Sequence, residues 1–113
     1  GPAVRQGDDQ WMDIVAWTLY ALINAEELGI TSANVDDMKA DSPNPSVARI
    51  VGSEGETGPS LGLSQDWAYT AIKQVGNYGE IYERTVEPLG IPRAGSVNDL
   101  WTRGGILYAP PVR

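Results

Sequence analysis

The longest apolar stretch of this chain runs through residues 11–23, where only Asp13 and Thr18 are polar. The stretch predicts a helix, yet a surface helix of a self-contained domain carries one apolar stripe and one polar face. Burying one Leu or Ile side chain contributes roughly 1.5–3 kcal/mol, so two or three exposed ones would cost an amount comparable with the ~5–15 kcal/mol net stability of a domain. We therefore expect a fragment of a longer protein, or a protomer that needs a partner.

Capping residues mark the ends of this helix and the start of the next. Asp8 follows a glycine and is the expected N-cap, while Gly29 lies between Leu28 and Ile30 and is suited to ending the helix in the left-handed conformation. A short second helix is predicted through residues 35–40. Its candidate caps are Thr31, Ser32 and Asn34.

A third short helix is predicted over residues 46–51. The Asn44-Pro45 pair is a cap followed by proline at the first helical position, and Gly52 is placed to end the helix. Residues 53–62 are rich in Gly, Ser, Glu, Thr and Pro and show no hydrophobic periodicity. We predict a loop there.

Two consecutive helices are predicted in the second half of the chain. Ser64 is the expected cap of the first, whose apolar residues repeat at helical spacing from Trp67 to Val75 before Gly76 ends it. The second begins with Asn77 and with Glu80 three residues later, the signature of a capping box. Residues 88–95 are predicted to be irregular because they carry no periodic pattern.

The C-terminal end is predicted to hold one helical turn and an extended tail. Ser96 or Asn98 is the expected cap of a turn through Leu100 and Trp101. Two glycines then end this turn, and residues 106–108 are predicted to be extended. Residues 2–5 and 106–108 are the strand-like pieces of the sequence. They could pair as a ribbon that is marginal in water, or residues 3–6 could belong to a sheet whose other strands lie outside this chain.

Composition limits the class of protein and of partner. The 113 residues fit one domain, and eight basic against fifteen acidic residues give a net charge of −7. The basic residues are scattered singly, which makes nucleic acid and anionic membrane surfaces unlikely partners. The sequence has no cysteine and no run of about 20 apolar residues. Because no charged region followed by an apolar region and a cleavage site opens it, we do not expect residue 1 to begin a signal peptide. Its opening Gly1-Pro2 is either a recombinant protease scar or the native cut point of a longer protein.

Catalytic chemistry has few candidate residues, because the chain lacks both His and Cys. Serine and cysteine triads and His-bearing zinc sites are therefore excluded. Carboxylates remain for acid-base work, including hydrolysis of a glycoside by a pair of them: Glu26, Glu27, Asp66, Glu80 and Glu83. We favour a structural interpretation, in which Asp66 and Glu80 serve helix starts and the Glu26-Glu27 pair is solvated. We accordingly expect no enzyme activity and no cofactor.

Metal, phosphate and sugar sites also have weak candidates. Asp36-Asp37 and Asp8-Asp9 lack the ligand spacing and the central glycine of a calcium loop, so they are interpreted as surface or cap residues. The Gly-rich segment 52–58 carries two glutamates and no Gly-Lys-Ser/Thr, which opposes phosphate binding. Tryptophans at helical spacing are more often core than stacking platforms: Trp11, Trp17, Trp67 and Trp101.

Several segments together resemble a known family. Residues 2–11, Pro-Ala-Val-Arg-Gln-Gly-Asp-Asp-Gln-Trp, resemble the second hinge crossing of periplasmic amino-acid-binding proteins of ABC transporters, and residues 72–82 resemble their closing helix pair with a Gly-x-Tyr turn. Residues 11–30, 29–35, 66–69, 100–101 and 105–113 resemble the general L-amino-acid-binding subgroup with its longer C-terminal region. The resemblance covers residues 2–113.

The resemblance implies a fold, a location and a function for a longer parent protein. The chain would be a mainly α, C-terminal segment of an α/β bilobed (type II) binding protein, with residues 1–7 as a hinge-strand remnant and 8–113 as the helical part of lobe 1. The parent would capture L-amino acids in the periplasm and deliver them to the membrane permease. Ligand-holding segments lie mainly upstream in this family, so no ligand-binding residue is assigned, and Arg5 matches a basic residue of the hinge strand.

Two other classes of protein stay open. A stand-alone helical interaction module would bury the apolar surplus against another chain, and a small helical hydrolase would need carboxylates that converge in a cleft. For the isolated chain we expect no appreciable binding of free amino acids. We also expect self-association through the exposed helix.

Overall fold

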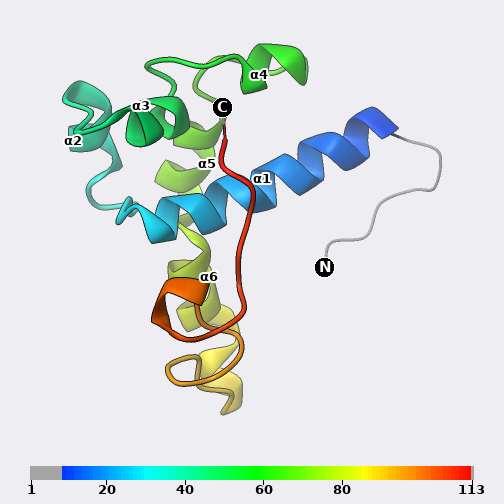
Figure 1. The fold of residues 1–113 in the computed structure, drawn as a ribbon, viewed down its shortest axis with the longest axis vertical. Coiled ribbons are helices and arrows are strands. Elements are labelled where there is room, and N and C mark those ends of the chain that lie inside the picture. The colour runs from blue at the N-terminus through cyan, green and yellow to red at the C-terminus, as the bar shows by residue number, and fades with distance from the viewer. Residues whose placement is uncertain (1–8, 113) are drawn as a thin grey trace.

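The computed structural model describes residues 9–112 (Figure 1), which form helices and connecting segments without a β-strand among them. The α-helices are α1 (Asp9–Glu27), α2 (Val35–Ala40), α3 (Pro45–Val51), α4 (Thr57–Ser60), α5 (Trp67–Val75) and α6 (Tyr78–Thr85). Two 3₁₀ turns follow, η1 (Glu87–Leu89) and η2 (Trp101–Arg103). The prediction of a mainly α chain is confirmed.

Helix α1 has a covered half and an uncovered half. Residues 21–25 are buried, and α3, α5 and α6 pack against the helix. Toward the N-terminus, residues 14–20 are half-buried, and Trp11 and Met12 are 51% and 49% exposed. Figure 1 shows this end of α1 projecting beyond the other helices. The expectation that the chain cannot cover its most apolar helix therefore holds for the N-terminal half.

The core forms where α1, α3 and α5 meet. Its buried side chains are aliphatic and come from both ends of the chain. They are Ala21, Leu22, Ala25, Ile30, Val35, Val47, Ile50, Val51, Ala68, Ile72 and Val112. Because this core includes Val112, the C-terminal end is part of the folded unit.

Local capping rules place several helix ends as predicted. The amide of Ile30 donates to Ala25 O at 2.8 Å around Gly29, whose φ is +74°. Asn44 Oδ1 accepts from the amide of Val47 at 3.0 Å, with proline at the start of α3. Asn77 and Glu80 form the reciprocal capping box of α6. The predicted N-cap of α1, Asp8, lies outside the described residues.

Other boundaries differ from the predictions. The segment 53–62, predicted as a loop, contains α4. Gly58 in this helix is buried, and a Cβ there would lie 3.1 Å from Nε1 of the Trp67 indole. Ser64 does not cap α5, since the helix starts at Trp67 and the Ser64 hydroxyl donates to Asp66 Oδ1 at 3.0 Å. The helix within residues 53–62 and the hydrogen bond between Ser64 and Asp66 were not predicted from the residue spacing.

Two further predictions concern the C-terminal turn and the short strand-like pieces. The predicted turn through Leu100 and Trp101 begins later, as η2, and Ser96 Oγ instead accepts from the amide of Asn98 at 3.1 Å. Leu107 forms an isolated parallel bridge with Leu100. Residues 2–5, the other candidate for pairing, lie outside the described part of the chain.

The C-terminal tail, residues 104–112, returns across α1, as Figure 1 shows in red. Trp101 N donates to Leu107 O at 2.9 Å, and Leu107 N donates to Asp99 O at 3.1 Å. Farther along, Asn24 Nδ2 of α1 donates to Pro110 O at 2.7 Å. These bonds fix the tail against α1 and bring Val112 into the core. Between residues 9 and 112, no helix has the length and apolarity of a bilayer span.

Candidate functional site

Four charged side chains meet where α1, α6 and the segment leading to η2 come together, and we call them the charge cluster: Glu26, Arg93, Asp99 and Arg103. Arg93 donates hydrogen bonds to the Glu26 carboxylate from both terminal nitrogens. Nη2 lies 2.7 Å from Oε1, and Nη1 donates to Oε2. Arg103 Nη2 lies 3.0 Å from Glu26 Oε2 and 2.8 Å from Asp99 Oδ1. The cluster therefore contains two guanidinium groups and two carboxylates, and its formal charges balance.

Arg93 and Asp99 are buried, and the side chain of Glu26 is nearly so. The side chains of Arg93, Asp99 and Glu26 are 7%, 8% and 10% exposed, whereas that of Arg103 is 50% exposed. The guanidinium carbon of Arg93 also lies 5.2 Å from the ring centroid of Tyr78 and 5.6 Å from that of Tyr82. Buried charges of this kind persist only when they are paired and hydrogen-bonded. The charge cluster thus joins α1 to the C-terminal region.

The electrostatics of the cluster follow from its hydrogen bonds. The hydrogen bond from Arg103 holds the pKa of Asp99 below its usual value, against the effect of burial, and the amide of Leu100 adds a second bond. In turn, Asp99 and then Glu26 raise the pKa of Arg103. Asp99 therefore stays ionised at neutral pH as one half of an ion pair.

The structure separates the carboxylates that the sequence offered for acid-base work. The side chain of Glu26 is only 10% exposed in the charge cluster, so the prediction that the Glu26-Glu27 pair is solvated is wrong for Glu26 and right for the exposed Glu27. The two glutamates differ because Arg93 pairs with Glu26 and not with Glu27. Arg93 is 67 residues away along the chain, so the local sequence does not reveal this contact.

The remaining candidates have structural surroundings. Glu80 completes the capping box and also accepts from the Ser32 hydroxyl at 2.7 Å. Burial alone would raise the pKa of Glu80, but the bonds from Ser32 and Asn77 lower it overall. Asp66 precedes α5 and lies 3.7 Å from Lys39 Nζ, and Glu83 is exposed on α6. Among residues 9–112, no group of three or more acidic side chains is arranged to hold a metal.

No family model matches the chain. It is 64% identical over 118 residues to the general L-amino acid-binding periplasmic protein AapJ of Rhizobium johnstonii, in an alignment that covers 100% of this chain and 34% of that protein. The putative amino-acid ABC transporter-binding protein YhdW of Escherichia coli K12 is 55% identical, with 100% of this chain and 33% of that protein covered. The chain is homologous to the C-terminal third of amino-acid-binding periplasmic proteins of ABC transporters.

A solved structure extends this likeness to the fold of these binding proteins. An ABC transporter periplasmic binding protein from Brucella ovis, with glutathione bound, superposes with a TM-score of 0.89 at 51% identity. The superposition covers 97% of this chain and 35% of the Brucella chain. The chain thus spans about a third of the length of the curated relatives it matches, and the resemblance found in the sequence is confirmed.

Sequence reasoning missed the residues that hold α1 to the C-terminal region of this binding-protein segment. Arg93 stands in a Pro- and Gly-containing stretch, and the one sequence signal is the spacing of four residues between Asp99 and Arg103. No local rule links either residue to Glu26. Arg5 and the predicted hinge strand, residues 1–7, lie outside the described residues.

The tryptophans divide between core and surface. Trp17 and Trp67 pack against the core of the segment, as the helical spacing predicted. Trp101 is 51% exposed and makes an edge-to-face contact with Tyr108 at 6.0 Å, and Trp11 is exposed to the same extent. Trp17 and Trp67 thus fit the expectation that tryptophans at helical spacing are core more often than stacking platforms, whereas Trp11 and Trp101 are about half exposed in this chain.

Proposed function

We propose that this chain belongs to a periplasmic binding protein that captures L-amino acids and delivers them to the membrane permease of an ABC transporter. The observation that supports this is 64% identity, over the whole chain, with a general L-amino acid-binding periplasmic protein. Within that protein, the 113 residues would supply part of one lobe. The two thirds of the relatives' length that this chain does not match would supply the rest of the ligand cleft.

The uncovered half of α1 supports a role inside a larger protein. Trp11 and Met12 are about half exposed, and a self-contained domain gains stability by burying such side chains. We propose that this face of α1 packs on the remainder of lobe 1. Residues 1–7 would be the hinge strand that precedes α1, and residues 8–113 the helical part of the lobe. A few residues at the ends of elements are enough to absorb the backbone rotation of a hinge.

Glutathione is a second candidate ligand, because the related Brucella ovis protein has glutathione bound. Glutathione carries a free α-ammonium and α-carboxylate on its γ-glutamyl residue, so one amino-acid head-group site could hold either ligand. A peptide-sized ligand would then need additional room in the cleft. The choice between the two ligands lies in the part of the protein that this chain does not contain.

Calorimetric titration tests the proposal. The coding region is expressed together with the sequence upstream of Gly1, and the product is titrated with a panel of L-amino acids and with glutathione. Saturable heat from at least one of these ligands is expected in the longer protein. The 113-residue chain alone is the control, and we expect no heat from it. A longer product that binds none of the ligands, or a lone chain that binds them, would overturn the proposal.

Delivery to the permease needs a separate measurement. In proteoliposomes that hold the cognate permease, the liganded binding protein is expected to stimulate ATP hydrolysis, and the 113-residue chain is not. A stand-alone interaction module predicts a different result. In that case a start codon directly precedes Gly1, and the chain binds its partner without any upstream sequence.

A further inference from the structure

The segment before η2 and the C-terminal tail lie side by side as a short ribbon. Ile106 N donates to Val97 O at 3.0 Å, and Trp101 N donates to Leu107 O at 2.9 Å. Successive side chains of an extended segment point to opposite sides. Leu107 packs against the buried Leu100. The side of the ribbon that carries Leu107 therefore faces the protein, and the other side faces outward.

Four large apolar side chains of this ribbon are exposed, and we call them the ribbon face: Val97, Trp101, Ile106 and Tyr108. They are 63%, 51%, 76% and 58% exposed, respectively. Single apolar residues on a surface need no explanation, but a group of them marks a place where another surface packs. The ribbon face is therefore a candidate contact surface.

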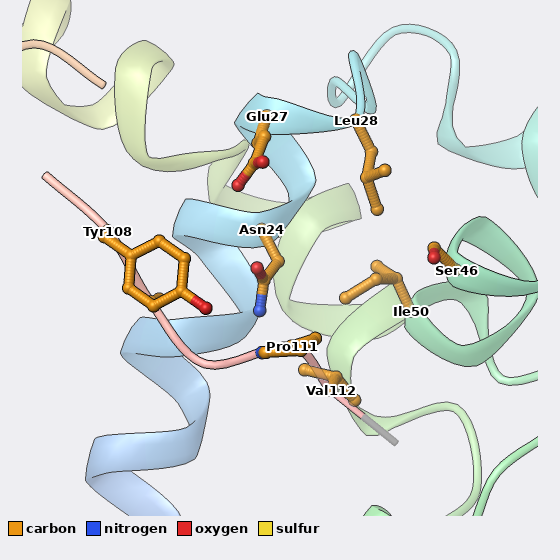
Figure 2. Close-up of a pocket in the computed structure, with 9 residues that line it drawn as sticks. Asn24, Glu27, Leu28, Ser46, Ile50, Tyr108, Pro111 and Val112 are labelled. Carbon is orange, nitrogen blue, oxygen red and sulfur yellow. The ribbon is translucent and has the colours of Figure 1, made fainter. Parts of the chain in front are cut away.

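The tail that carries half of the ribbon face is fixed in position. Asn24 Nδ2 donates to Pro110 O at 2.7 Å, and Val112 is buried in the core. Figure 2 shows the side-chain nitrogen of Asn24 turned toward the tail next to Pro111, beside the pocket that the tail borders with α1 and α3. A surface that packs on the ribbon face therefore meets a preformed partner, and the contact carries no cost of ordering the tail.

The ribbon face lies in a part of the sequence that is poor in charges. Residues 94–98 and 104–112 contain no charged side chain, although 20% of the whole sequence is charged. Between these two stretches, Asp99 and Arg103 are paired with each other in the charge cluster. Charged residues are depleted at the buried centre of interfaces, and permanent interfaces are more apolar than transient ones. The composition therefore favours a permanent cover over a partner that docks and leaves.

We propose that the ribbon face packs permanently on the part of the same binding protein that this chain does not contain. The length of that part supports this occupant, because the chain matches 34% of AapJ and 35% of the Brucella ovis protein. The surface that meets the ribbon face is apolar and uncharged. This contact is additional to the one proposed for the uncovered half of α1. The inference rests on the proposed function in one respect, since it needs the longer protein.

Thiol labelling of the longer protein tests this contact. The chain contains no cysteine, so Ile106→Cys places a thiol on the ribbon face, and Glu83→Cys is the control at an exposed position of α6. The rate of reaction with N-ethylmaleimide in the native protein is divided by the rate in urea, and mass spectrometry of the C-terminal peptides locates the label. We expect this ratio to be at least about tenfold lower for Ile106→Cys, because a covered thiol reacts only after local opening.

Other occupants of the ribbon face give different results in the same experiment. Equal ratios for Ile106→Cys and Glu83→Cys would show that nothing covers the ribbon face and would refute the inference. Protection that disappears on dilution would refute it in favour of a second copy of the protein. Protection that appears only in proteoliposomes with the permease would refute it in favour of that membrane partner.

A charged substitution tests the stability that the contact contributes. Ile106→Asp buries an unpaired carboxylate if the ribbon face is covered, so the longer protein should unfold at a lower denaturant concentration. Leu89→Asp is the matched control, because Leu89 of η1 is also 76% exposed and lies outside the ribbon face. A midpoint for Ile106→Asp that is no lower than that for Leu89→Asp would refute the inference. If Ile106→Asp does not fold, labelling of Ile106→Cys still decides.

Calorimetric titration of the longer protein separates this inference from the proposed function. A protein that binds an amino acid or glutathione but leaves Ile106→Cys unprotected refutes the inference and supports the proposed function. A protected thiol in a protein that binds none of these ligands does the reverse.

Discussion

Gly79 of α6 lies so close to Glu26 of α1 that a Cβ built on the glycine would be 2.8 Å from Cδ of the carboxylate. A flexible side chain could move away from such a contact. Glu26 cannot do so freely, because Arg93 and Arg103 both hold its oxygens. The absence of a side chain at Gly79 is therefore a condition for the charge cluster to close.

We predict that Gly79→Ala destabilises the fold by about 1–3 kcal/mol, the range for overpacking. This loss would occur even though alanine favours a helix by roughly 1 kcal/mol over glycine. Chemical denaturation measures the effect. A double-mutant cycle with Glu26→Ala isolates the contact, since Gly79→Ala should be harmless once the carboxylate is gone. Equal costs of Gly79→Ala in both backgrounds would contradict this explanation.

Breaking the buried part of the charge cluster should be costly. Arg93→Met removes one of the two guanidinium partners of the Glu26 carboxylate, whose side chain is 10% exposed. Because Arg103 still pairs with that carboxylate, the loss should exceed about 1 kcal/mol but stay below the roughly 3–5 kcal/mol of a buried charge left without a partner. The control is Lys73→Met, which breaks the exposed pair with Asp36 and should cost at most about 1 kcal/mol. Unfolding curves of the two variants are compared. Similar losses of stability would show that burial does not set the energy of the Arg93 pair.

Acid should weaken the fold through Asp99. Its pKa in the folded state lies below the reference value of 3.8, mainly because of the hydrogen bond from Arg103. Below that value the unfolded chain binds more protons than the folded one, so stability rises with pH in this window. The contribution is complete above about pH 5 and is lost as the pH falls through the folded pKa.

We expect Asp99→Asn to flatten the dependence of the free energy of unfolding on pH below about 4. NMR titration of the Asp99 carboxyl carbon in Arg103→Met should show a higher pKa than in the unaltered chain, because the largest cause of the lowering is removed. A stability curve for Asp99→Asn that runs parallel to the unaltered one, or an unmoved pKa in Arg103→Met, would be inconsistent with this account.

The 113-residue chain on its own is expected to self-associate through the uncovered half of α1. Met12→Lys should reduce the average mass in light scattering, because it places a charge on that face. Leu89→Lys makes the same change at a residue of η1 that is also exposed, and it controls for the added charge. A strictly monomeric unaltered chain, or equal effects of both variants, would count against α1 as the contact surface.

The elements that the sequence predicts well depend on neighbours within one helical turn. Asn44 reaches the amide of Val47, and Asn77 reaches that of Glu80. Each of these caps joins two residues that are three positions apart, so residue type and spacing are enough to predict it. The resemblance to binding proteins was likewise detectable, because its motifs are contiguous in the chain.

Contacts over long sequence separations escaped prediction. Glu26 and Arg93 are 67 residues apart, and no periodic pattern in the sequence predicts their contact. The short helix α4 was also missed; within it Gly58 lies so close to Trp67 that a Cβ there would be 3.1 Å from Nε1 of the indole. The hydrogen bond from Asn24 to Pro110 also requires the tail to fold back over α1. Both long-range contacts are set by tertiary packing, which a single sequence does not encode in adjacent positions.

The return of the tail over α1 has a consequence during protein synthesis. Asn24 and Pro110 are 86 residues apart, and Val112 enters the core near the very end of the chain. Helix α1 therefore leaves the ribosome long before the residues that will cover it have been translated. The part of α1 that the tail covers therefore stays exposed during that interval, and transiently exposed apolar surface of this kind favours aggregation and the binding of chaperones.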